Sequence, residues 1–276
     1  MARTGTAFVL GGGGVLGAVE VGMLRALFEA GIRPDLVVGT SVGALNGAFV
    51  AAQPDIGVVE RLEGLWSEVA RGDAKVYDSG PVKQVRRALT TGTHLHSSQP
   101  LRERLAAELG DVTFAELAVP FQCVAASIEK AGEHWFSEGR VVDAVVASAA
   151  MPGLLPPAEV DGEHFLDGGI VNSIPVGRAA ELGAKTIYVL QVGRIERPLK
   201  PPTRPWEVAR VSFEIARRHR FHRDMASLPR GVRAHVLPTG GGSAKDDSLR
   251  AYRDFRNVKR RIDQAYDAST AYLAEQ

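Results

Sequence analysis

The sequence predicts an α/β fold of three layers, with helices on both faces of a mainly parallel central sheet. Two short apolar runs, residues 6–10 and 36–39, each lead into a glycine-rich turn and then into a helical pattern. This alternation of strand and helix favours parallel strands joined by crossover helices. The chain has 276 residues, of which 45% are hydrophobic and 24% charged, and this suits one large domain with a sizeable core.

The order of the elements follows from the spacing of apolar residues. Apolar runs bounded by turn residues predict buried strands at residues 6–10, 36–39 and 186–192. Further strands are expected at residues 121–128 and 134–137 around a turn, and short ones at 164–169 and 233–237. Apolar residues that recur every three to four positions predict helices, and these cover residues 17–30, 44–49, 56–69, 100–109 and 141–150.

The chain divides into a core and an extension. Residues 1–192 carry the strand and helix pattern and form the core. Residues 193–276 contain a proline-rich linker at 198–205 and then two basic helices. We expect this extension to pack on the core, so that the chain forms one structural domain overall.

Composition excludes several classes of protein. The formal net charge of +1 predicts no nucleic-acid partner, and a single cysteine, Cys123, cannot build a disulfide framework. The sequence contains no run of about 18 apolar residues, so no membrane span is predicted. The first apolar run is too short for the hydrophobic region of a signal peptide. We therefore expect a cytoplasmic protein whose contact with a membrane, if it makes one, is peripheral.

The stretch GTSVG, residues 39–43, has the pattern of a nucleophile elbow. In such an elbow a serine stands on a sharp turn between a strand and a helix, and Gly39 and Gly43 leave room for the backbone around Ser41. An incidental serine in a glycine-rich turn is the alternative interpretation.

The stretch GGGVLG, residues 12–17, follows the first strand and admits two interpretations. It matches the dinucleotide fingerprint, but the acid that should follow the second strand is missing, because Asp35 precedes that strand. Alternatively, backbone N–H groups of the glycines form an oxyanion hole. The carboxyl ends of parallel strands share one sheet edge, so the loop and Ser41 would face one cavity.

A serine nucleophile needs a base. Ser41, Asp167 and His235 occur in the chain order of an α/β-hydrolase triad. However, none of the seven histidines lies at a strand end beside glycines, and these are His94, His96, His134, His164, His219, His222 and His235. Asp167 does lie at a predicted strand end beside glycines, because Gly168 and Gly169 follow it. An ordinary turn would show the same pattern.

Together the stretches GGGGVLG, GTSVG, ASAAMPGLLPP (147–157) and DGGIVNSIPV (167–176) resemble the patatin-like phospholipase family. The resemblance covers about residues 8–192. It implies a patatin-like fold and hydrolysis of fatty-acyl esters of lipids, without a metal or other cofactor. It also implies that Ser41 is the nucleophile, that Asp167 is the base of a Ser–Asp dyad, and that the oxyanion hole comes from Gly12, Gly13 and Gly14. The supporting motif glycines are Gly17, Gly39, Gly43, Gly168 and Gly169.

One position departs from the family pattern. Leu16 stands where the family commonly has Arg or Lys before the last glycine of its loop. This predicts ester hydrolysis with a weaker hold on an anionic head group. A catalytically silent protein that binds lipid or acts as a scaffold on the same fold is the alternative function.

Basic residues cluster in the extension. The clusters are Arg217, Arg218, His219, Arg220, His222, Arg223 and, further on, Arg256, Lys259, Arg260, Arg261. Interspersed acids favour a solvated helix face, and peripheral contact with an anionic membrane surface is the alternative.

Overall fold

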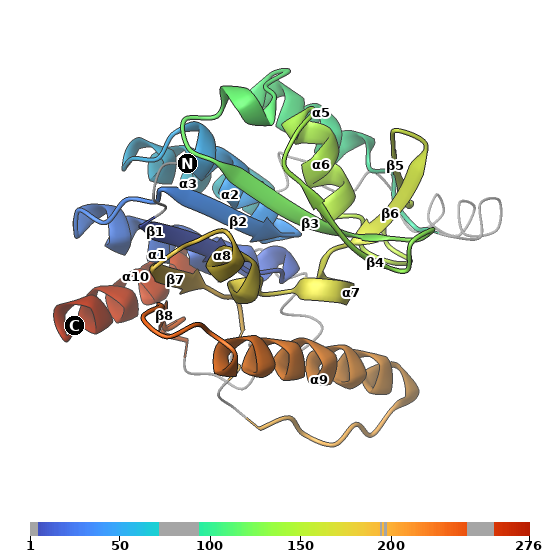
Figure 1. Cartoon of the computed structure of the whole chain (residues 1–276). Helices are drawn as coiled ribbons and strands as arrows, with labels where there is room; N and C mark the ends of the chain where they lie inside the picture. Colours follow the sequence, from blue (N-terminus) through green and yellow to red (C-terminus); the bar gives the residue numbers. More distant parts are fainter. Residues whose placement is uncertain (1–4, 72–93, 194, 196–197, 242–256) are drawn as a thin grey trace.

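The computed structural model describes residues 5–71, 94–193, 195, 198–241 and 257–276. Its centre is an eight-stranded sheet with the order β5-β6-β3-β2-β1-β7-β8, and β4 also pairs with β3 (Figure 1). The strands are β1 Thr6–Leu10, β2 Leu36–Thr40, β3 Phe121–Ser127, β4 Gly132–Phe136, β5 Ala158–Val160, β6 Glu163–Asp167, β7 Thr186–Leu190 and β8 Arg233–Val236.

The pairing is parallel in the middle of the sheet and antiparallel at one end. β3, β2, β1, β7 and β8 run parallel to one another. β4 and β6 run antiparallel to β3, and β5 runs antiparallel to β6. The predicted mainly parallel α/β sheet is therefore confirmed, with the addition of an antiparallel end that contains the unpredicted β5.

Helices cover both faces of this sheet (Figure 1). They are α1 Ala18–Glu29, α2 Val42–Ala52, α3 Gly57–Arg71, α5 Gln99–Leu109, α6 Val141–Ser148, α7 Gly169–Asn172, α8 Val176–Glu181, α9 Pro205–Ala226 and α10 Val258–Ala274. Short 3₁₀ turns lie at Gly14–Gly17 and Phe114–Glu116. In the described ranges, no helix is both long and apolar enough to cross a bilayer.

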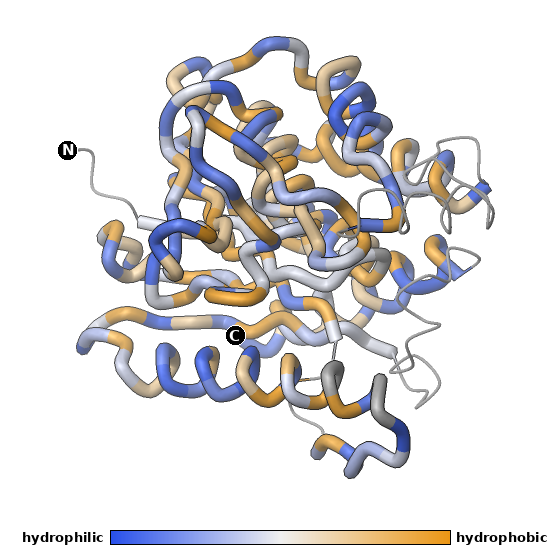
Figure 2. Tube along the Cα trace, turned by 90° about the vertical axis from the view of Figure 1, so that its right-hand side faces the viewer, coloured by the Kyte–Doolittle hydropathy of each residue, from blue (hydrophilic) through white to orange (hydrophobic). Residues whose placement is uncertain are grey.

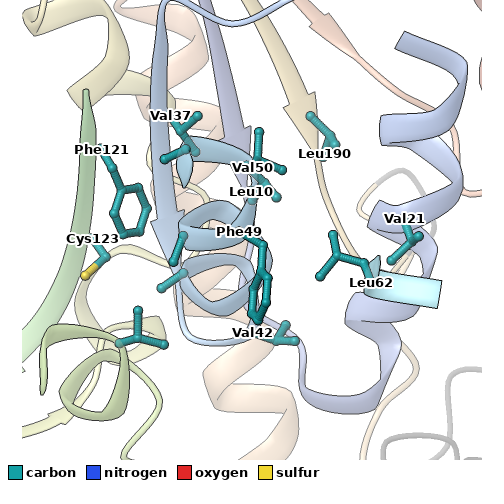
Figure 3. Packing of buried hydrophobic residues seen from close by; sticks show 14 of the residues in the cluster. Leu10, Val21, Val37, Val42, Phe49, Val50, Leu62, Phe121, Cys123 and Leu190 are labelled. Carbon is teal, nitrogen blue, oxygen red and sulfur yellow. The ribbon is translucent and has the colours of Figure 1, made fainter. Parts of the chain in front are cut away.

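Strand side chains are buried on both faces because each face carries helices. Along β1, Phe8 and Leu10 pack into one hydrophobic cluster, whereas Ala7 and Val9 pack into the other. Figure 3 shows part of the first cluster, in which Phe49 of α2 lies near Leu10. The second cluster contains residues of α8 and α9.

The described residues after 192 add β8, α9 and α10 to this body. β8 pairs in parallel with β7, and α10 packs along α1. α9 lies across the opposite face, where its residues alternate between hydrophilic and hydrophobic (Figures 1 and 2). Two arginines of the basic clusters, Arg217 and Arg261, are buried, so they do not belong to a solvated face and cannot meet a membrane surface. Arg256 lies outside the described residues.

Candidate active site

Ser41 lies on a strained turn between β2 and α2. Its backbone has φ 55° and ψ −121°, a conformation that L-residues other than glycine rarely adopt. The flanking glycines explain how the turn closes. A Cβ at Gly39 would lie 2.5 Å from the carbonyl oxygen of Gly43, and one at Gly43 would lie 2.3 Å from that of Leu10. Only glycine fits at these two positions.

The hydroxyl of Ser41 donates a hydrogen bond of 2.6 Å to Oδ2 of Asp167. The other carboxylate oxygen, Oδ1, accepts the N–H of Gly169 at 2.7 Å. Asp167 is the last residue of β6, whose antiparallel pairing with β3 places it opposite Ala125. The structure therefore brings together the two residues that the sequence singled out, from segments far apart in the chain.

Burial changes the acidity of this carboxyl group. Asp167 is only 6% exposed, and desolvation raises its pKa from 3.8 to about 6, although the bonds from Ser41 and Gly169 oppose the shift. A carboxylate with a pKa near 6 is a stronger base than an ordinary aspartate and is still mostly ionised at neutral pH.

Ser148, at the end of α6, stabilises the strained turn through hydrogen bonds of its side chain. Its hydroxyl accepts the N–H of Ser41 at 2.9 Å and donates to the carbonyl oxygen of Val124 at 2.6 Å. That same carbonyl lies 2.1 Å from where a Cβ at Gly168 would be, so Gly168 lets β6 approach β3. No role is assigned to Ser148 from the sequence, although it lies within the stretch 147–157 that carries part of the family resemblance.

The glycine loop lies beside Ser41. A Cβ at Gly12 would lie 3.4 Å from Cβ of Ser41. However, the Gly12 N–H already donates to the carbonyl oxygen of Ser173 at 2.9 Å. The expectation that Gly12 supplies an oxyanion donor therefore does not fit this geometry. Among the described residues, the N–H groups of Gly13 and Gly14 donate no backbone hydrogen bond outside regular elements.

Packing fixes the shape of the loop at both ends. Gly13 lies against Val192, whose Cγ2 would be 1.7 Å from an added Cβ, and Gly14 has a φ of +58°. At the far end, an added Cβ on Gly17 would lie 2.4 Å from Cγ2 of Val42. Asn46 of α2 donates to the Gly17 carbonyl oxygen at 3.0 Å. Close packing thus explains Gly13 and Gly17, and backbone conformation explains Gly14.

Other residues considered from the sequence lie elsewhere. Asp35 accepts the N–H groups of Gly5 and Thr6, at the start of β1 and away from the glycine loop, so it is not placed to bind a ribose there. Leu16 is buried in the main hydrophobic cluster.

The histidines serve other contacts. His134 packs against Phe136 and His235 stacks on Tyr188, with ring centroids 4.4 and 5.0 Å apart. Within the described ranges, the hydrogen-bond partner of the Ser41 hydroxyl is Asp167 rather than a histidine. The same ranges contain no group of three or more His, Cys, Asp or Glu side chains that could hold a metal ion.

Comparison with known proteins places this geometry in context. The structure of VipD from Legionella pneumophila superposes with a TM-score of 0.51 at 16% identity, covering 99% of this chain and 67% of that one, and so shares the fold. Lysophospholipase nte1 of Aspergillus terreus is 32% identical over 192 residues, which is 68% of this chain and 12% of that protein.

Neuropathy target esterase sws of Drosophila melanogaster is also 32% identical, over 67% of this chain and 13% of that protein. The chain thus spans about an eighth of the length of these relatives. A family model described as patatin-like phospholipase matches residues 8–180, a segment that contains the glycine loop, the elbow and Asp167. A match over more than half of the chain, on the fold just described, shows that this protein belongs to the patatin-like phospholipase family.

Proposed function

We propose that the protein hydrolyses fatty-acyl ester bonds of lipids through a dyad of Ser41 and Asp167. The observation that carries the proposal is the 2.6 Å bond from the hydroxyl of Ser41, on its strained turn, to a buried carboxylate of raised pKa. Strained backbone of this kind clusters at functional sites, and a nucleophilic serine needs a base within hydrogen-bond distance.

In the proposed reaction, Oδ2 of Asp167 takes the proton of the Ser41 hydroxyl as Oγ attacks the ester carbonyl carbon. The protonated carboxyl then gives this proton to the departing alcohol, and an acyl-enzyme forms on Ser41. Water attacks the acyl-enzyme in the second half of the reaction, with Asp167 again accepting a proton and returning it to Oγ. No metal or organic cofactor takes part in this scheme.

The negative charge on the carbonyl oxygen needs hydrogen-bond donors fixed in advance. We assign this role to the N–H groups of Gly13 and Gly14, which lie in the loop beside Ser41 and, among the described residues, donate to no backbone acceptor outside regular elements. Gly12 instead serves the loop's structure through its bond to Ser173.

Apolar side chains near the dyad support an acyl chain as the substrate group. Met151, Ile170 and Phe213 are large hydrophobic residues that remain exposed. Ile170 directly follows Gly169, and the ring of Phe213 approaches that glycine. Met151 follows Ala150, whose carbonyl oxygen accepts the N–H of Asp167. The names lysophospholipase and esterase borne by the relatives agree with a lipid ester substrate.

A fluorophosphonate probe tests the proposal directly. We expect the probe to label the wild-type protein and to leave Ser41→Ala unlabelled, with parallel loss of p-nitrophenyl butyrate hydrolysis. Ser227→Ala, at an exposed serine that follows α9, is a matched control that removes a hydroxyl without touching Ser41 or its supports. A well-folded wild-type protein that neither reacts with the probe nor cleaves esters would favour the silent lipid-binding or scaffold function.

A further inference from the structure

Arg217 of α9 is a buried cation whose hydrogen bonds all end inside the protein. Its side chain is 3% exposed. Nε donates to the hydroxyl of Ser173 at 3.1 Å, and one terminal nitrogen donates to the carbonyl oxygen of Val192 at 2.6 Å. The other terminal nitrogen pairs with Glu214 at 3.3 Å. Burial of such a group is costly unless every donor is satisfied in good geometry.

Both uncharged acceptors of Arg217 touch the glycine loop. The carbonyl oxygen of Ser173 accepts the Gly12 N–H at 2.9 Å, and the Ser173 hydroxyl lies 3.3 Å from where a Cβ at Gly12 would be. Val192 packs against Gly13 so closely that no Cβ fits between them. Arg217 therefore braces the two residues that fix the position of Gly12 and Gly13.

We infer that Arg217 is a positioning residue for the oxyanion loop, so that the segment after the proline-rich linker completes the active site. This inference rests on the proposed function. The guanidinium is buried, and each of its three nitrogens donates to a protein acceptor, so we assign it an action through Ser173 and Val192 rather than on the substrate. Arg217 also lies beyond residue 180, where the match to the family model ends.

Charge and shape both require arginine at this position. Glu214 lies between Arg217 and Arg218, at 3.3 and 3.2 Å, and balances part of their charge. A lysine could keep the ion pair with Glu214, but its single ammonium group cannot reproduce the planar fork that reaches Ser173 and Val192 together.

The test compares Arg217→Ala and Arg217→Lys with Arg223→Ala, an exposed arginine of the same helix that pairs with Asp224. Turnover of p-nitrophenyl butyrate is measured per active site, counted by fluorophosphonate titration, and melting temperature is recorded for each variant. We expect kcat of Arg217→Ala to fall roughly 10- to 100-fold with KM little changed, less than the roughly 10²–10³-fold that loss of an oxyanion donor costs. Arg217→Lys should lose part of kcat, and Arg223→Ala none.

Two readouts separate positioning from a general effect on folding. Guanidinium at low millimolar concentration should restore part of the kcat of Arg217→Ala and leave Arg223→Ala unchanged. The effect of Arg217→Ala should also be smaller in a Ser173→Ala background, because the two side chains act as one unit. Wild-type kcat per titrated site in Arg217→Ala or Arg217→Lys, even with a lowered melting temperature, overturns the inference. An unreactive wild-type protein would instead overturn the proposed function itself.

Discussion

Ser41 and Asp167 are 126 positions apart in the chain, yet their side chains share a hydrogen bond of 2.6 Å. Each residue is held by its own support. Ser148 bonds the backbone of Ser41, and the Gly169 N–H bonds the second oxygen of Asp167. The geometry of this pair is therefore fixed by hydrogen bonds on both sides, and its acid–base behaviour follows from the burial of one carboxyl group.

The first prediction concerns the pH dependence of catalysis. Asp167 acts as a base only when ionised, and its pKa is about 6. We expect kcat/KM to fall about tenfold per pH unit below this value and to level off above it. The measurement is a pH profile on a neutral ester. A profile that stays flat down to pH 4 would exclude Asp167 as the titrating base.

The second prediction concerns Asp167→Asn. The amide oxygen can keep the bond from the Gly169 N–H, and the NH₂ group can donate to Ser41, so the fold should survive while the base is lost. We expect hydrolysis to fall by at least about a hundredfold, at the low end of what general-base catalysis contributes. Activity within a few-fold of wild type would contradict the dyad.

The same variant should change stability in a pH-dependent way. The pKa of Asp167 is raised in the folded protein, from 3.8 to about 6, so folding favours the protonated form. The stability of the wild type should therefore decline as pH rises from about 4 through 6. Asp167→Asn lacks this penalty and should be more stable at pH 8 by up to about 3 kcal/mol, with the advantage vanishing near pH 4. Denaturant titrations at the two pH values measure it.

The third prediction concerns the strain at Ser41. Relief of its positive φ is worth about 1–3 kcal/mol, whereas glycine costs about 0.5–1 kcal/mol of extra conformational entropy. We therefore expect Ser41→Gly to be more stable than Ser41→Ala by about 1 kcal/mol. At Ser148, in α6, the order should reverse, and this provides the control. A lower stability of Ser41→Gly than of Ser41→Ala would contradict strain at the turn.

The fourth prediction concerns the contact between Gly13 and Val192. In Gly13→Ala the new Cβ would meet Cγ2 of Val192 at 1.7 Å and Cβ at 2.9 Å, so the loop must shift. We expect a loss of turnover approaching roughly 10²–10³-fold. Adding Val192→Ala removes the worst contact and should restore part of kcat, whereas Val192→Ala alone should have a smaller effect. No recovery in the double variant would show that the contact is not what displaces the loop.

The fifth prediction concerns substrate preference. Leu16 carries no charge and packs in the hydrophobic cluster, and Arg217 is buried with each guanidinium nitrogen bonded to a protein acceptor. Neither residue can hold a phosphate. We expect higher kcat/KM on short and medium acyl p-nitrophenyl esters and on monoacyl phospholipids than on diacyl phospholipids of matched chain length. A preference for the diacyl lipids in such a panel would contradict this. Leu16→Arg would bury a charge and is therefore a poor test.

The pairing of Ser41 with Asp167 could be predicted from the sequence because each residue is marked locally by glycines. Gly39, Gly43 and Gly168 are required by contacts under 3 Å, and such contacts leave a readable pattern. The central parallel strands β1, β2 and β7 could likewise be predicted, because each is a short apolar run. β5 is only three residues long, and the direction of β6 depends on its pairing with β3, so neither could be read from local sequence.

Arg217 shows what local sequence could not reveal. Arg217 and its neighbours Arg218, Arg220 and Arg223 lie between Glu214 and Asp224, in a charged stretch of the kind expected for a solvated helix. Nothing in that stretch distinguishes Arg217 as the buried member. The hydrogen-bond acceptor of the Gly12 N–H could not be predicted either, because it is the backbone carbonyl oxygen of Ser173. Backbone acceptors have no signature in the sequence, because every residue carries one.

Asp167 arrives on β6, which is bonded to β3 on one side and to β5 on the other. Successive residues of a strand face opposite sides of a sheet, so inserting or deleting one residue within β6 would turn the carboxylate to the wrong face. The turn between β5 and β6 is different, since Asp161 and Gly162 already have positive φ values of 50° and 79° and lie outside the ladder. Length differences between relatives should therefore gather at this turn, while the residue count along β6 stays constant even where its amino acids change.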